Sequence, residues 1–288
     1  MTEAHGGYYV PHKAYWPIVG SVGLTTLMVG FASLLEGHDF GGHMMIAGAV
    51  IVAIMMFGWF GTVIRENLAG LYSEQVDRSF RWGMGWFIFS EVMFFSAFFG
   101  ALFYARIYSV PWLGGLGAKG AAHTYLWPHF TAVWPTNGPG AIGGAFESMP
   151  AWGIPAINTL ILLTSSVTVT WAHWALKAEQ RGRLIFWLLC TVLLGASFLY
   201  MQAHEYIHAY TKLHLTLHSG IYGSTFFMLT GFHGLHVAIG ATMLAVMLVR
   251  AIKGHFTPED HFAFEAAAWY WHFVDVVWLN LFIFVYWL

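Results

Sequence analysis

Residues 81–106 read RWGMGWFIFSEVMFFSAFFGALFYAR, and Glu91 is the one charged residue between the two flanking arginines. An apolar run of about 20 residues is long enough to cross the roughly 30 Å hydrocarbon layer of a membrane as a helix. The stretch therefore predicts a membrane-spanning helix with a carboxyl group inside it.

The composition of the whole chain agrees with this reading. Of 288 residues, 58% are hydrophobic and only 9% are charged, whereas a soluble domain has about 25% charged residues. The net charge of -2 provides no basic field for nucleic acid. A single cysteine, Cys190, excludes both a disulfide framework and a thiolate metal cluster. We therefore expect an integral membrane protein with no nucleic-acid partner.

Further apolar runs predict an all-α fold with seven transmembrane helices. We expect these helices near 17–35, 43–64, 81–107, 153–176, 184–206, 220–250 and 264–287.

Basic residues predict the orientation, because short cytoplasmic loops carry the excess of Lys and Arg. An inner N-terminus and an outer C-terminus place nine basic residues inside and three outside. The inner residues are Lys13, Arg65, Arg78, Arg81, Lys177, Arg181, Arg183, Arg250 and Lys253, and the outer ones are Arg106, Lys119 and Lys212.

Glu91 is the first candidate for function. A charge in a spanning helix costs several kcal/mol, so an intramembrane carboxyl is a functional-site hypothesis by default. Phe87 precedes Glu91 and Phe94 and Phe95 follow it, all at helical spacing, so they predict a dry wall around the carboxyl. Lipid or proton chemistry and a structural hydrogen bond to a facing helix both fit this pattern.

Histidines in the last two spans form a second candidate group. His233 and His236 stand three apart on one helix, and His272 and Asp275 do the same on the next. A buried polar cluster that joins helices three, six and seven would explain all four residues. Haem or metal ligation is the alternative, because histidine is the commonest metal ligand.

Basic residues at the inner ends of the helices are a third candidate. Arg65, Arg81, Arg250 and His255 could surround an anionic lipid headgroup. Ordinary flanking of the spans by positive charge explains the same pattern.

Three segments of the chain closely resemble one protein family. FEAAAWYWHFVDVVWL at 264–279, YGSTFF with TGFHGLHVAIG within 222–240, and RWGMGWFIFSEVMFF at 81–95 resemble subunit III of haem-copper cytochrome c oxidase. The motifs VIRE at 63–66 and WAH at 171–173 stand at the intervals found in that family.

The resemblance implies a subunit without redox centres of its own. In the family, haem and copper are held by subunits I and II, and subunit III packs mainly against subunit I in an enzyme that takes electrons from cytochrome c. Subunit III protects subunit I from inactivation and supports proton uptake. The expected function is therefore that of a non-catalytic, phospholipid-binding subunit of a proton-pumping oxidase.

The resemblance also implies a division of the chain. A two-helix bundle (1–66) is expected to splay from a five-helix bundle (81–288) across an inner linker (67–80), which creates a V-shaped lipid cleft. The long outer loop at 108–152 belongs to the five-helix part. Its aromatic content predicts packing rather than disorder.

Where a motif of this chain matches one of the family, the resemblance implies the same functional residue at that position. Glu91 matches the glutamate that carbodiimides modify. The expected lipid contacts are Trp59, Arg65, Arg81, Arg250 and His255. Departures such as WPT at 134–136 and the altered PHKAYWP segment resemble bacterial members, which implies a multi-pass protein of a bacterial inner membrane.

Two other functions compete with this one. QAHEYIHAY at 202–210 contains His204-Glu205-x-x-His208, the pattern of zinc proteases. A zinc protease needs a third ligand that nothing in the sequence supplies, so Glu205 and Tyr206 are expected to cap or anchor a helix end at the membrane interface. Adventitious metal binding at the surface is the other interpretation of the two histidines. A quinol oxidase subunit III is the other alternative, but those chains usually have five spans.

Overall fold

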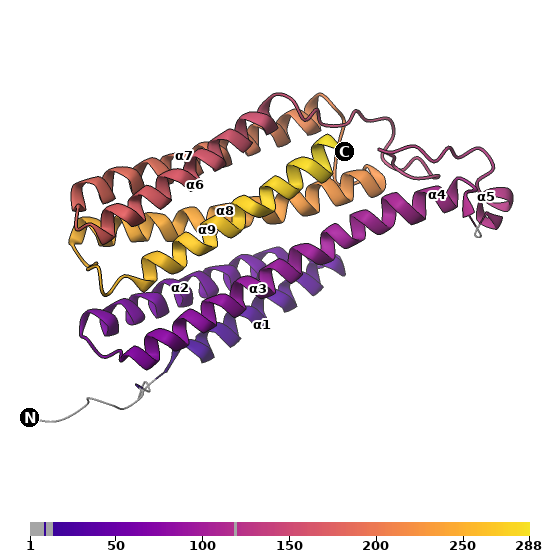
Figure 1. Ribbon diagram of the computed structural model, residues 1–288. Coiled ribbons are helices and arrows are strands. Elements are labelled where there is room, and N and C mark those ends of the chain that lie inside the picture. Colours follow the sequence, from indigo (N-terminus) through magenta and orange to yellow (C-terminus); the bar gives the residue numbers. More distant parts are fainter. Residues whose placement is uncertain (1–8, 10–13, 118–119) are drawn as a thin grey trace, which may run out of the picture. The chain divides into compact units, whose positions relative to one another are not determined.

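The computed structural model describes residues 9, 14–117 and 120–288. Within this part, seven helices are long and apolar enough to cross a membrane, so the prediction of an all-α, seven-span protein is confirmed (Figure 1). They are α1 (Trp16–Leu35), α2 (Phe40–Leu68), α3 (Glu74–Tyr104), α6 (Ile154–Lys177), α7 (Arg181–Thr211), α8 (Gly220–Lys253) and α9 (Phe262–Leu281).

Shorter elements extend two of these helices. The π-helix η1 (Ala105–Ser109) and α4 (Val110–Leu113) continue α3, and the π-helix η3 (Phe282–Trp287) continues α9. A short helix, α5 (Ala121–Tyr125), lies in the long loop before α6.

Several helices are longer than their apolar runs. The third begins at Glu74 instead of residue 81, and the fifth continues to Thr211 instead of ending near 206. Hydropathy marks only the segment that lies in hydrocarbon, whereas backbone hydrogen bonds continue the helix through polar residues on either side. The 31 residues of α7 span about 46 Å at 1.5 Å per residue, well beyond the hydrocarbon thickness.

The chain separates into two compact units, Met1–Trp82 and Gly83–Leu288. Two of the basic residues that predict the orientation, Lys13 and Lys119, lie outside the described residues.

In the first unit, α1 and α2 are antiparallel neighbours (Figure 1). Glycines form the contact between them. A Cβ atom built on Gly48 would lie 2.5 Å from the backbone nitrogen of Leu27, and one on Gly30 would lie 2.6 Å from the nitrogen of Met45. The missing side chains let the two backbones approach, which is how helices associate in lipid without a hydrophobic driving force.

In the second unit, α6, α7, α8 and α9 pack together (Figure 1). Large side chains form the core between these helices. Trp271 and Trp278 of α9 are both fully buried, and each indole N–H donates to α6, to Ser165 and Thr159 respectively, at 2.9 Å. A Cβ atom on Gly240 of α8 would lie 2.9 Å from the Trp271 ring. Glycine there creates the space that the tryptophan fills.

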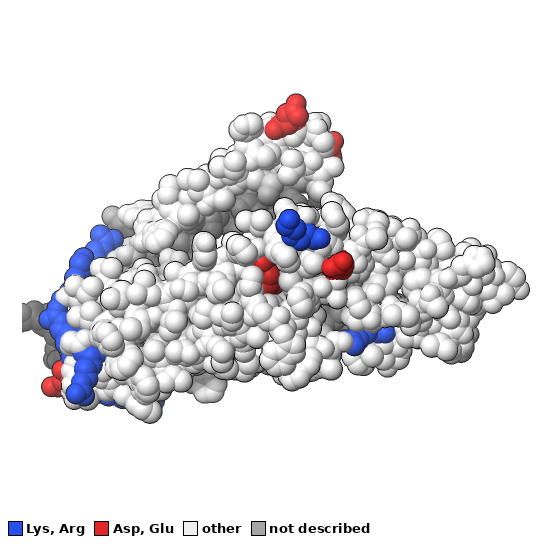
Figure 2. Space-filling model, turned by 90° about the horizontal axis from the view of Figure 1, so that it is seen from above, with Lys and Arg blue, Asp and Glu red and all other residues white. Residues whose placement is uncertain are grey.

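The long loop before α6 folds onto the start of α8, which agrees with the packing that its aromatic content predicts. Trp134 and Phe146 both contact the ring of Tyr222, at centroid distances of 5.8 and 5.5 Å. The Tyr222 backbone N–H donates to the carbonyl of Thr136, and that of Glu147 donates to Leu213. Charge is sparse on the face shown in Figure 2, where most of the visible surface belongs to residues other than Lys, Arg, Asp and Glu.

We predict that Gly48→Ala destabilises the first unit by about 1–3 kcal/mol, because the new methyl group overpacks against the α1 backbone. Thermal unfolding of the detergent-solubilised protein, followed by far-UV circular dichroism, measures the change. Gly61→Ala, on the same helix with no heavy atom within 4 Å of the added Cβ, is the matched control. Equal unfolding temperatures for the two variants would contradict the close contact.

Candidate functional site

Glu91 of α3 forms a pair with His236 of α8. The Glu91 Oε2 atom lies 2.8 Å from His236 Nε2, and the two side chains are 21% and 10% exposed. Glu91 is thus only partly covered in the isolated chain, and His236 is the group that supplies its polar contact across the helix interface.

The protonation of the pair is constrained by its other contact. The His236 Nδ1 atom lies 2.6 Å from the carbonyl oxygen of Phe232, which can only accept, so Nδ1 carries a proton and donates it. One further proton is then shared between Nε2 and the Glu91 carboxyl. It lies on the carboxyl in a neutral pair or on the imidazole in an ion pair, and transfer of that proton along the hydrogen bond interconverts the two forms.

Aromatic rings enclose this pair. The rings of Phe95, Phe94 and Tyr270 lie 4.9, 5.9 and 6.3 Å from the His236 ring, and Phe87 stacks on Tyr270 at 6.1 Å. The three phenylalanines of the predicted wall therefore lie around the pair, directly or through Tyr270. Their apolar surfaces lower the local dielectric and strengthen the interaction between the two polar groups.

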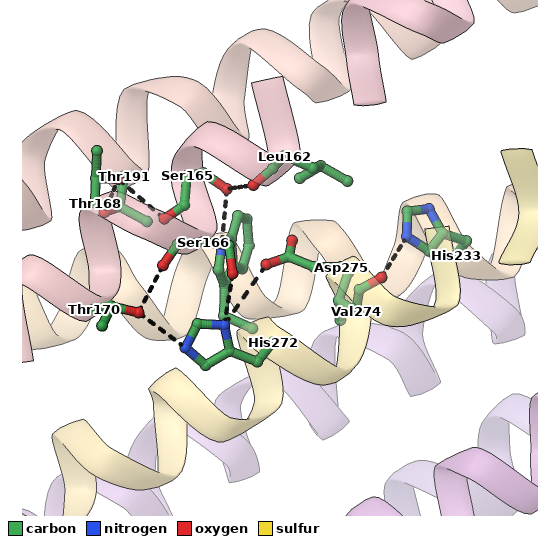
Figure 3. A network of polar contacts seen from close by, with 11 residues as sticks. Leu162, Ser165, Ser166, Thr168, Thr170, Thr191, His233, His272, Val274 and Asp275 are labelled. Carbon is green, nitrogen blue, oxygen red and sulfur yellow. Dashed lines mark hydrogen bonds and ion pairs between the residues drawn. The ribbon is translucent and has the colours of Figure 1, made fainter. Parts of the chain in front are cut away.

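His272 and Asp275 belong to a separate network between α9 and α6 (Figure 3). The His272 Nδ1 atom lies 2.7 Å from the hydroxyl of Ser166 and 3.9 Å from Asp275 Oδ2. The Thr170 hydroxyl donates to the Ser166 carbonyl, so at 3.5 Å it can only accept from His272 Nε2. This arrangement fits a neutral imidazole that donates from Nε2 and accepts the Ser166 proton at Nδ1.

His233 makes a third contact, again distinct from the others. It is fully buried, and its Nε2 atom donates to the carbonyl of Val274 on α9 at 3.2 Å (Figure 3). The four residues expected in one cluster thus lie at three contacts. Those contacts join α3 to α8, α8 to α9, and α9 to α6. Among the described residues, no group of three or more His, Cys, Asp or Glu side chains is arranged to hold a metal ion.

Three of the expected lipid contacts lie in the first unit. Trp59 is 45% exposed, and the exposed Arg65 donates to the Thr62 hydroxyl at 3.1 Å. Arg81 forms an ion pair with Asp77 one turn earlier on α3, at 2.8 Å. Arg65 therefore presents its charge more openly than Arg81.

The other two lie in the second unit, where α8 ends. Arg250 is only 4% exposed and its guanidinium lies 4.6 Å from the centre of the Phe256 ring. His255 donates its backbone N–H to the Arg250 carbonyl. Desolvation, together with the charges of Arg250 and Lys253, lowers the pKa of His255. A bound phosphate would oppose that shift, because its negative charge favours the imidazolium.

Glu66, which the sequence arguments did not single out, is a polar centre of the first unit. Its carboxylate accepts hydrogen bonds from the hydroxyls of Tyr9 and Tyr72, at 3.0 and 2.7 Å. Desolvation and the hydrogen bond to Glu66 raise the pKa of Tyr72. Its position next to Arg65 in VIRE was the available signal, but the two tyrosines are brought to it only by folding.

The structure does not bring His204, Glu205 and His208 together as a zinc-protease site. Glu205 is 1% exposed and points into the bundle, where it accepts a hydrogen bond from Tyr286 of η3 at 2.6 Å. His204 and His208 are exposed on another face of α7. The protease alternative is therefore wrong in its geometry, because the carboxylate and the two imidazoles do not face one site. The expectation that Glu205 anchors a helix end at the interface is also corrected, since Glu205 is buried in the core.

Comparison with known proteins shows to which family the chain belongs. The family model of cytochrome c oxidase subunit III matches residues 6–288. The chain belongs to this family. The Glu91–His236 pair and the aromatic core of α9 both lie within the matched region.

Individual relatives match the chain over nearly their full length. The chain is 41% identical to cytochrome c oxidase subunit 3 of Gadus morhua over 288 residues, which cover all of this chain and 99% of the relative. It is 40% identical to the subunit 3 of Oncorhynchus masou over 286 residues, or 99% of this chain and 98% of the relative. The protein is therefore a multi-pass membrane subunit of the respiratory chain's terminal oxidase.

We predict that Glu91→Ala destabilises the second unit more than Glu91→Gln does. The alanine variant leaves His236 Nε2 without its partner, which costs about 1–3 kcal/mol for a buried polar group. The glutamine amide can still donate to that nitrogen. Thermal unfolding of the two purified variants, compared with the parent protein, measures the difference. Equal destabilisation by both changes would argue against the pair.

Proposed function

We propose that this chain is a non-redox subunit of the oxidase that stabilises subunit I and supports proton uptake. The observation that carries the proposal is the contact between Glu91 and His236, within a chain that matches the subunit III family from end to end. The carboxyl and the imidazole share one proton inside an aromatic enclosure. Transfer of that proton from one group to the other leaves the net charge of the pair unchanged. We take this pair to be the proton-active element of the subunit.

Phospholipid binding is the second part of the proposal. Arg65 offers an exposed guanidinium, with Trp59 exposed earlier on the same helix. Arg250, which is largely buried against Phe256, adds a second guanidinium at the end of α8, and His255 lies beside it. Arginine suits a phosphate because its donors match two phosphate oxygens at once. We propose that these residues, with Arg81, bind the headgroups of phospholipids that remain with the purified complex.

The partners follow from the same proposal. Haem and copper are held by subunits I and II, which receive electrons from cytochrome c, and this chain contacts mainly subunit I. We propose a bacterial cytoplasmic membrane as its location, and the departures in its N-terminal and outer-loop sequences support this. The relatives described above are from fish, so this location rests on those departures alone.

Carbodiimide labelling tests the proton-active pair. We expect dicyclohexylcarbodiimide to modify one carboxyl of this chain in the assembled oxidase, and mass spectrometry of the digested subunit to place it at Glu91. Glu91→Gln should abolish this label. His236→Phe should change its rate, because the imidazole competes for the proton that the reaction needs. Labelling that persists in Glu91→Gln would contradict the assignment.

Lipid analysis tests the second part. We expect the double variant Arg65→Ala and Arg250→Gln to retain less phospholipid per oxidase and to lose activity in fewer turnovers, while the initial rate of electron transfer stays largely intact. Arg183→Ala removes an exposed basic residue of α7 that is not proposed as a lipid contact and is the matched control. Unchanged lipid content in the double variant would remove these residues from the proposed site.

A further inference from the structure

His204 and His208 are two metal-ligating side chains that the proposed function does not use. They stand four apart on α7, and both are exposed. Among the described residues, neither ring forms a hydrogen bond, an ion pair or a ring contact. Both imidazoles can therefore bind an external ligand such as a metal ion.

The position of the pair along α7 makes it accessible from water. Arg181 and Arg183 mark the end of the helix that meets one membrane surface. About 20 residues from Leu184 cross the hydrocarbon and reach Ala203. The remaining turns, His204–Thr211, extend into the opposite interface. An aqueous ion can reach imidazoles there without entering the lipid.

The helical register brings the two rings together. Residues four apart on a helix are neighbours on one face, with about 5–6 Å between their Cβ atoms. Two imidazoles on that spacing can both bind one ion, which is how the helical H-E-x-x-H pattern holds zinc. Nitrogen donors of this kind suit Zn²⁺, Cu²⁺ and Ni²⁺ and are poor ligands for Mg²⁺ or Ca²⁺.

The surroundings limit what such an ion could do. Glu205 lies on a different face, bonded to Tyr286, so no carboxylate stands beside the ion as a general base. The described residues contribute no third His, Cys, Asp or Glu ligand, so water completes the coordination. Lys212, one turn beyond His208, is exposed, and its charge is screened by solvent.

We propose that His204 and His208 form a binding site for one divalent transition-metal ion, of the Zn²⁺ class, at the surface of the subunit. The site is not catalytic, because no general base and no third protein ligand accompany the two imidazoles. It does not depend on the proposed lipid contacts or on the Glu91–His236 pair, since none of those residues belongs to it.

Equilibrium dialysis of the assembled oxidase against Zn²⁺ tests the site. We expect the parent complex to bind one more zinc ion at micromolar free metal than the double variant His204→Ala, His208→Ala. Each single variant should weaken that binding by about tenfold or more, because the second ligand acts at high effective concentration once the first is bound. Oxidase activity in the absence of added zinc should be the same in all of these proteins.

The control is His129→Ala, which removes another exposed histidine that has no histidine three or four residues away in the sequence. This variant should bind as much zinc as the parent. If each single variant lost half of the double variant's effect, the two histidines would be binding separate ions and the shared site would be overturned. Equal zinc binding by the parent and the double variant would overturn it as well.

Discussion

The structure depends on the absence of water from the hydrocarbon layer. Every backbone N–H and C=O within the layer must be paired inside the protein, and helices achieve this within a single segment. The same constraint applies to side chains, since each polar group in the layer needs a partner on its own helix or on a neighbour. The hydroxyls of Ser165 and Thr159 meet the two buried tryptophans for this reason.

Within this constraint, the two units hold together by different means. In the first unit, glycines bring two helical backbones into contact, and few side chains are buried. In the second, glycine on one helix creates the space into which Trp271 of another fits, and indole N–H groups tie the helices together. The helices packed in this way in the second unit carry the Glu91–His236 pair and the Asp275 network.

The H-E-x-x-H segment shows how one helix divides a sequence pattern among different roles. Successive residues on a helix are about 100° apart, so the motif's carboxylate and its imidazoles can face different surroundings. Here Glu205 is committed to the core through Tyr286, while His204 and His208 face outward. The sequence motif is that of a zinc protease. In the folded chain, however, the buried carboxylate contributes to stability, and the two exposed imidazoles are the groups that we propose bind a metal ion.

The sequence by itself determined the all-helical, seven-span fold and the family, because hydropathy and length decide what can cross a membrane and the motifs extend over the whole chain. It also pointed to Glu91 as an ionisable group in an apolar helix. Only the tertiary structure decided which partner each polar residue meets. His236 faces Glu91, His272 faces Ser166, and His233 donates to Val274, so one expected cluster is three separate contacts. The burial of Glu205 and the two tyrosines on Glu66 also depend on folding. The physical reason is that helix rotation and interhelical register, which place side chains from distant segments together, arise from packing and leave no local pattern in the sequence.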